Sequence, residues 1–190
     1  MSTAYHNVSS LVEKSYYHDL SIKEQINSRV NIVFTMQLAA ITLIGYFYKN
    51  IDFSGLLWAV AGVSALTGMA LIIWLLSLRY SFKAFSDGYL YAILPPANDI
   101  LLYKKQLEMH DHDNSEKTLS EYLDMKFAEC SDCNSSLNIK RSNLAATAIS
   151  CLKYSAALLL FSSIIFFSAT LDMSSERHKQ NIISQQIKEF

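Results

Sequence analysis

The sequence predicts an all-α membrane protein: an oligomeric bundle with three transmembrane helices, the third continuing from a long cytoplasmic stalk helix. Residues 30–48 contain no charged side chain, and residues 54–79 contain none before Arg79. Residues 118–171 contain neither Pro nor Gly. A hydrocarbon core of about 30 Å needs roughly 20 apolar residues in a helix. Charged residues make up only 17% of the 190-residue chain, and their scarcity is concentrated in these segments.

Residues 118–171 are predicted to form one helix that starts in water and ends across a membrane. The run Thr118-Leu-Ser-Glu121 has the pattern of a capping box, which marks a helix start. Apolar positions then recur at helical spacing, at Leu119, Leu123, Phe127, Cys130, Cys133, Leu137 and Leu144. Residues 142–171 keep a single charge, Lys153. The helix would be about 80 Å long, so a stalk precedes a third span at 142–171.

The remaining segments are assigned around these spans. Residues 1–29 are predicted to form an amphipathic cytoplasmic helix that runs into the first span, 30–48. The turn at 49–53 is short, so the spans 30–48 and 54–79 form a hairpin. Within the cytoplasmic region 81–141, a helix with an aromatic face is expected up to Leu94, before Pro95-Pro96, and Asn98 is expected to cap a second helix. Residues 172–190 form a polar tail.

Basic residues near the span ends predict the orientation. They are more frequent before the first span and in the middle segment than in the turn, at Lys14, Lys23, Arg29, Arg79, Lys83, Lys140 and Arg141. Cytoplasmic loops carry an excess of Lys and Arg. The N-terminus and residues 80–141 are therefore expected in the cytoplasm.

Small residues in the second span favour close helix packing. They occur four apart in the pairs Ala61 with Ala65 and Ser64 with Gly68. The first span carries the polar residues Asn31, Thr35, Gln37 and Thr42. Polar groups face lipid at a cost, so these side chains should face other helices or a water-filled pore.

Residues that could carry chemistry do not combine into an enzyme site. Cys130 and Cys133 form a lone C-x-x-C, and zinc would need two further ligands. The residues His110-Asp-His-Asp113 could bind a metal but resemble a solvated loop. No phosphate-binding glycine loop or nucleophile motif is present. A non-enzymatic protein without metal or cofactor is predicted, with the cysteines packed on the apolar stripe.

The stalk is predicted to hold a homo-oligomer together, most simply a tetramer. Asn134, Asn138 and Arg141 share one helix face, and Asn is a poor helix former that can set register when it is buried between helices. An ordinary solvated face is the alternative. The predicted seam comprises Leu123, Phe127, Asn134, Leu137 and Asn138.

Basic residues form a predicted collar at the inner membrane surface. Its members are Arg29, Arg79, Lys83, Lys140, Arg141 and Lys153. Positive-inside bias alone would account for them; the alternative is a site for a nucleotide or oligonucleotide. The predicted ligand-binding residues are Arg79, Lys83, Lys104, Lys105, Lys140 and Arg141, and the predicted pore-lining residues are Ser150, Ser155, Ser162 and Ser163.

The architecture resembles small membrane effectors of bacterial anti-phage defence. The resemblance rests on a hairpin of spans, a cytoplasmic insert, and a helix reading Tyr122-Leu…Cys130-Ser-Asp-Cys-Asn134…Asn138-Ile-Lys-Arg141 before a third span. It covers roughly residues 20–170. The chain is similar to SLATT and Pycsar-type proteins and to the membrane partner of Hailong systems, which accompany a nucleotidyltransferase.

The resemblance implies an ion channel or membrane-disrupting protein of the bacterial inner membrane. A nucleotide or oligonucleotide signal from the partner enzyme would control it, and opening would depolarise the cell in abortive infection. Many such proteins carry a separate sensor domain, and we expect none within this sequence. A non-conducting membrane anchor or sensor subunit that recruits a soluble partner is the alternative.

The predicted orientation can be tested by cysteine labelling in intact cells. In a chain with Cys130, Cys133 and Cys151 replaced by Ala, a cysteine at Asp113 should resist an impermeant thiol reagent. A cysteine at Ser54, in the turn after the first span, should react and serves as the control. Labelling at 113 with protection at 54 would reverse the topology.

Overall fold

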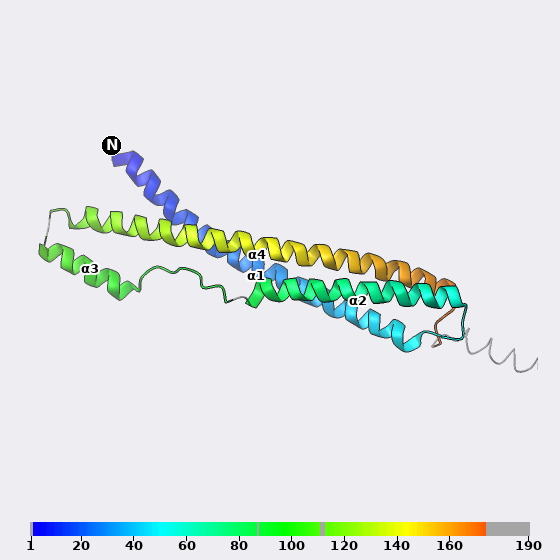
Figure 1. Ribbon diagram of the computed structural model, residues 1–190. Helices are drawn as coiled ribbons and strands as arrows, with labels where there is room; N and C mark the ends of the chain where they lie inside the picture. The colour runs from blue at the N-terminus through cyan, green and yellow to red at the C-terminus, as the bar shows by residue number, and fades with distance from the viewer. Residues whose placement is uncertain (1, 87, 111–112, 174–190) are drawn as a thin grey trace, which may run out of the picture. The chain divides into compact units, whose positions relative to one another are not determined.

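The computed structural model describes residues 2–86, 88–110 and 113–173, with side chains from residue 8 onward. These residues form four α-helices: α1 (Ser2–Asn50), α2 (Leu57–Ser86), α3 (Ala97–His110) and α4 (Ser115–Ser168) (Figure 1). Within the described residues, α1, α2 and α4 each contain a stretch long and apolar enough to cross a membrane. The predicted all-α class is confirmed, and so is the presence of three helices that could span a membrane.

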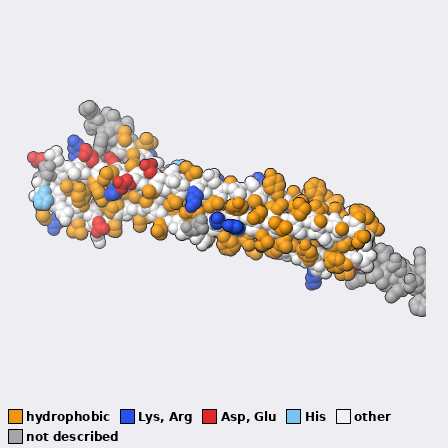
Figure 2. Space-filling model, in the orientation of Figure 1, with side chains coloured by type: hydrophobic (Ala, Val, Ile, Leu, Met, Phe, Trp, Pro, Cys, Tyr) orange, Lys and Arg blue, Asp and Glu red, His pale blue; other side chains and the backbone are white. Residues whose placement is uncertain are grey.

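The chain divides into two compact units, and α1 and α4 contribute to both. Unit 1 comprises Met1–Ser28 and Phe85–Asn143, and unit 2 comprises Arg29–Ala84 and Leu144–Phe190. Unit 2 therefore holds the apolar parts of α1, α2 and α4. On the face drawn in Figure 2, hydrophobic side chains cover the span segments, and acidic side chains gather on unit 1.

Unit 2 is built around the small side chains of α2. The buried positions of this helix are Ala59, Val60, Val63, Thr67, Ala70, Ser77, Ser81 and Ala84. Small side chains let helix backbones approach closely, which is the main source of packing energy in lipid. The expected small-residue packing is thus present, but on another face: Ala61 and Ala65 are exposed, and Ser64 and Gly68 are only partly buried.

Hydrogen bonds between the spans accompany this close packing. The Ser77 hydroxyl donates to the carbonyl of Ala148 at 2.8 Å, and the Ser155 hydroxyl donates to the carbonyl of Ala70 at 2.9 Å. The amide nitrogen of Gln37 donates to the hydroxyl oxygens of Ser77 and Ser81, at 2.8 and 3.0 Å. Each bond joins two different helices and so fixes how the helices are rotated against one another.

The two chain segments beyond α1 and α4 pair at one end of unit 2. The Asp52 amide donates to the carbonyl of Leu171 at 2.8 Å, and the Met173 amide donates to the carbonyl of Asn50 at 3.0 Å. α4 consequently ends at Ser168, short of the predicted end at 171, and Thr170 takes a left-handed conformation with φ of 53°. That turn redirects the chain into the pairing.

Helix ends in unit 1 differ from the prediction. α2 ends at Ser86 instead of continuing to Leu94, and Gly88 has a φ of 64°, which a helix cannot accommodate. Residues 88–96, here called the strap, are non-helical. Asn98 is not the cap of α3, because the carbonyl of Pro96 already accepts from the amides of Asp99 and Ile100.

The prediction for α1 agrees with the structure, whereas the predicted start of α4 does not. α1 runs without interruption from Ser2 to Asn50, which confirms that the N-terminal helix continues into the first span. α4 begins at Ser115, and the amide of Thr118 donates to the carbonyl of Asn114. Thr118 therefore lies inside the helix, and the predicted capping box is not its start.

Candidate functional site

The side chain of Arg141 lies at the centre of a polar cluster in unit 1. Only 3% of the residue is exposed. One terminal nitrogen donates to the hydroxyl of Tyr91 at 2.9 Å, and the other donates to the side-chain oxygen of Asn27 at 2.6 Å. The guanidinium carbon lies 5.3 Å from the ring centroid of Tyr89, within range of a cation–π interaction. Arg141 thus joins α4 to α1 and to the strap.

Two asparagines of α4 extend the cluster along the strap. Asn134 accepts from the amide of Ala92 at 2.8 Å and donates to the carbonyl of the same residue at 3.0 Å. Asn138 accepts from the Tyr91 hydroxyl at 2.7 Å and donates to the carbonyl of Asp19 at 2.8 Å. Ala92 lies in the non-helical strap, and Asn134 pairs its amide and carbonyl, which would be costly to bury unpaired.

The side chain of Asp19 on α1 is also held by a contact with α4. Asp19 is buried, with 6% exposure, and accepts from the hydroxyl of Ser131 at 2.6 Å. The Ser131 oxygen also lies 3.0 Å from that of Ser15. Further along, Ser9 donates to the carboxylate of Asp124 at 2.6 Å. A continuous row of polar contacts therefore fixes α1 on α4 within unit 1.

A pocket of about 450 Å³ opens beside this cluster, and it is here called the tyrosine pocket. Lys23 and Lys140 each lie near a tyrosine ring, with their ammonium nitrogens 4.6 Å from the Tyr91 centroid and 5.4 Å from the Tyr89 centroid, respectively. The lining residues are Lys23, Asn27, Phe85, Ser86, Gly88, Tyr89, Leu90, Tyr91 and Arg141. Cations, aromatic rings and an amide together suit a planar ligand that carries negative charge.

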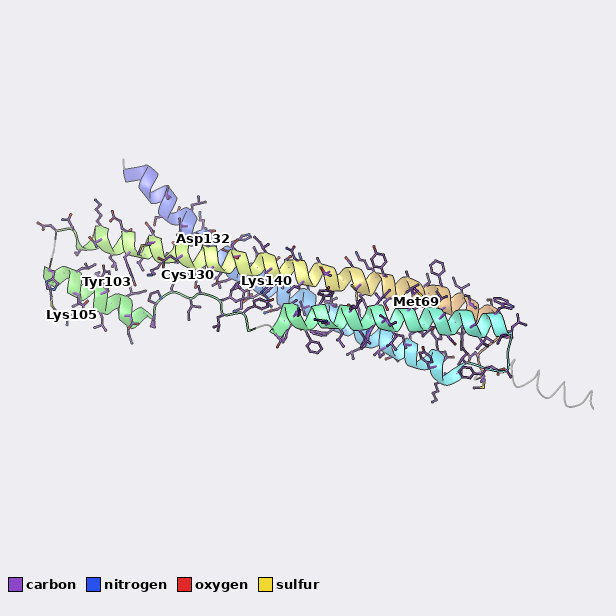
Figure 3. The ribbon with its side chains drawn as sticks, in the orientation of Figure 1. Met69, Tyr103, Lys105, Cys130, Asp132 and Lys140 are labelled. Atoms are coloured by element: carbon purple, nitrogen blue, oxygen red, sulfur yellow. The ribbon has the colours of Figure 1, made fainter. Side chains whose placement is uncertain are left out.

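The predicted ligand-binding residues do not form one site. Arg141 belongs to the tyrosine pocket, and Lys140 lies next to Tyr89. Lys104 and Lys105 lie on α3, and Figure 3 shows Lys105 well separated from Lys140. Lys104 pairs with Glu108 at 3.8 Å. Arg79 and Lys83 are exposed residues of α2 in unit 2.

The predicted seam residues contact other parts of the same chain. Phe127 packs its ring against that of Tyr16 on α1, with centroids 5.5 Å apart. Leu123 and Leu137 are partly buried, and the amides of Asn134 and Asn138 make the contacts described above. Part of the apolar stripe of α4 is therefore covered by α1 of the same chain.

The cysteines of the stripe occupy different environments. Cys130 is buried and Cys133 is exposed. Burial raises the pKa of the Cys130 thiol, which favours the neutral, unreactive form. Within the described part of the chain, no group of three or more His, Cys, Asp or Glu side chains could hold a metal ion. Asp111 and His112 lie outside the described residues, as does most of the polar tail.

The predicted pore-lining serines fall into two pairs. Ser155 and Ser162 are fully buried against α2, where Ser155 donates to the Ala70 carbonyl and Ser162 lies 2.8 Å from the hydroxyl of Thr67. Ser150 is exposed and Ser163 is partly buried. Ser155 and Ser162 therefore take part in packing against α2 of the same chain.

A row of exposed side chains on α1 was not predicted from the sequence as one face. Asn31, Thr35, Leu38 and Thr42 are all exposed, at alternating steps of four, three and four residues, and are here called the α1 strip. Gln37, by contrast, is 1% exposed and faces α2. Spacing alone could have shown the row, because residues three and four apart share a helix face.

Comparisons of the chain with protein-family models, with curated proteins and with solved structures give no match.

Because Arg141 is buried and Lys140 is exposed, we predict that replacing Arg141 destabilises the protein more than replacing Lys140. Replacing Arg141 by Leu leaves Tyr91 and Asn27 without a donor and should lower the free energy of unfolding by about 1–3 kcal/mol. Lys140→Leu, at an exposed position, should change it little. Thermal unfolding of the helical signal in detergent measures both, and equal stability of the Arg141 variant and the wild type would contradict the cluster.

Proposed function

We propose that this chain is a homo-oligomeric, pore-forming membrane effector whose polar path is lined by the α1 strip. The observation that carries the proposal is the exposure of Asn31, Thr35 and Thr42 on one face of a membrane-spanning helix. Polar side chains within a bilayer are rare and generally face other helices or water. Among the described residues of the chain, none covers this face.

The outward faces of α2 and α4 are apolar, in contrast to the α1 strip. α2 exposes large apolar residues, among them Met69 (labelled in Figure 3), Ile72 and Leu75. α4 exposes Leu160, Phe161, Ile164 and Phe167. These surfaces suit lipid, whereas the α1 strip does not. A ring of subunits with α1 inward would place the strip on a central path and leave α2 and α4 toward lipid, and a tetramer is the assembly that we propose to test first.

One observation favours the second candidate, a non-conducting anchor. The Thr35 hydroxyl donates to the carbonyl of Asn31 at 3.1 Å, and the Thr42 hydroxyl donates to the carbonyl of Leu38 at 2.8 Å. These donors are satisfied within the helix, so a dry contact between subunits would also accommodate the strip. In that case α1 would join subunits, and unit 1 would recruit a soluble partner.

We further propose that a nucleotide or oligonucleotide, made by a partner nucleotidyltransferase, controls the pore through the tyrosine pocket. Support comes from Lys23 and Lys140 beside the tyrosine rings and from the room of about 450 Å³. Opening would depolarise the bacterial inner membrane, in the anti-phage setting that the resemblance implies. Arg141 is occupied by its contacts within the chain, so the exposed Lys140 is the better residue to change.

Ion flux from liposomes tests the pore. Thr35→Leu with Thr42→Leu makes the strip apolar and should strongly reduce the flux, because ions would lose the polar lining of the path. Ala61→Leu with Ala65→Leu adds apolar side chains to the exposed face of α2 and should leave the flux unchanged. Wild-type protein that associates but does not conduct would support the anchor. Monomeric protein in detergent and in cross-linked membranes would reject both.

The same liposomes test ligand control. A short oligonucleotide should change the flux of the wild type, and less so as salt is raised, because phosphate contacts release counterions. Lys140→Glu should remove the response, and Lys105→Glu, on α3, is the matched control. A response that Lys140→Glu leaves intact, or no response in the wild type, would reject the tyrosine pocket as the control site.

A further inference from the structure

Unit 2 contains an apolar groove of about 680 Å³ between α1 and α4, separate from the α1 strip. Large side chains such as Ile32, Met36 and Leu160 line it. Small side chains, Ala39, Ala40, and Ala156, leave the space open between the helices. Because both helix segments lie in apolar spans, the groove is exposed to lipid when the chain is in a membrane.

Among the described residues, two cations and no carboxylate line the groove. They are Arg29 of α1 and Lys153 of α4, and both are exposed. Lys153 lies within the apolar segment of α4, where a charged side chain costs about 2.5–3.5 kcal/mol at the bilayer centre. About 20 residues cross the hydrocarbon core. Counted back from Ser168, where α4 ends, that length reaches Ile149, so Lys153 lies about one helical turn inside the core, and its long side chain can extend to the level of the lipid phosphates.

The charges decide between the possible occupants of the groove. A second copy of this chain would bring a span to the groove, but residues 30–48, 54–79 and 142–171 contain no Asp or Glu to meet Arg29 and Lys153. A soluble anion would not use the apolar walls. A lipid with a negatively charged headgroup satisfies both parts, because basic pockets between membrane helices on the cytoplasmic side bind anionic headgroups.

We propose that the groove between α1 and α4 binds an anionic phospholipid. One acyl chain lies between Met36 and Leu160, and the phosphate lies near Arg29 and Lys153. The lipid would hold α1 against α4 on the face that the bonds of Ser77 and Gln37 do not reach. The proposal depends on membrane insertion of unit 2 and not on conduction.

Native mass spectrometry of the full chain in detergent with added lipid tests the site. The probes are phosphatidylglycerol and phosphatidylcholine with identical acyl chains, and the wild type should retain phosphatidylglycerol preferentially. Lys153→Gln should lower that preference about fivefold, the effect of one cation near an anionic lipid. Lys49→Gln, an exposed cation at the other end of α1, should behave as the wild type.

A second variant tests the groove without changing charge. Ala156→Phe should fill the space and reduce retention of both lipids, and the exposed position should allow the chain to fold, as the helical signal will check. Equal retention of the two lipids by the wild type, or full retention by Ala156→Phe, would overturn the proposal. A change in oligomer size with unchanged lipid retention would do the same, because it would identify a second copy as the occupant.

Discussion

The small polar contacts between α1, α2 and α4 fix the rotation of each membrane helix, and the surface of unit 2 depends on that rotation. In lipid there is no hydrophobic force between helices, so packing of small side chains and hydrogen bonds must supply specificity. Ser77, Ser155 and Ser162 each reach a backbone carbonyl of another helix. Gln37 then sets α1 by donating to two serines of α2. With α1 held in this way, the α1 strip faces outward, and Met36 and Leu43 border the groove.

Unit 1 uses polar contacts for a different purpose. Its strap is non-helical, and α4 holds it through Asn134, which bonds the backbone of Ala92, and through Asn138, which accepts from the Tyr91 hydroxyl. Arg141 completes the contact by bonding to the Tyr91 hydroxyl, which in turn donates to Asn138. The result is a pocket whose tyrosine rings are held in place while Lys23 and Lys140 remain beside them. A charged ligand there would contact α1, the strap and α4 together.

The apolar spans could be predicted because long stretches without charged residues are typical of membrane-spanning helices. Helix ends were harder to predict, since aromatic residues keep a helical spacing up to Tyr91 although Gly88 has already turned the chain. The sequence also indicated that Asn134, Asn138 and Arg141 share a face with unusual residues for a helix. Their partners could not be read from it, because Asp19, Asn27 and the strap lie far away in sequence. The stripe was therefore assigned to a second subunit, whereas Tyr16 of the same chain packs on it.

Which serines of α4 are buried could not be predicted from the sequence either. Ser150, Ser155, Ser162 and Ser163 look alike in sequence, and only the neighbouring helix decides that Ser155 and Ser162 are buried. The α1 strip, in contrast, needs no distant partner to be recognised. Its polar residues recur at three and four positions, and the opposite face of α1 carries the apolar residues Val30, Val33, Ile44 and Phe47. What the strip faces in the membrane is the question on which pore and anchor both depend.

The central claim, that the α1 strip is shielded from lipid by other subunits, is tested most directly by spin labels in bilayers. Labels at Thr35 and Thr42 would be compared with labels at Ile72 of α2 and Ile164 of α4 for relaxation by oxygen, which partitions into lipid. We expect low oxygen accessibility at 35 and 42 and high accessibility at 72 and 164. Equal, high accessibility at all four positions would place the strip in lipid and contradict it.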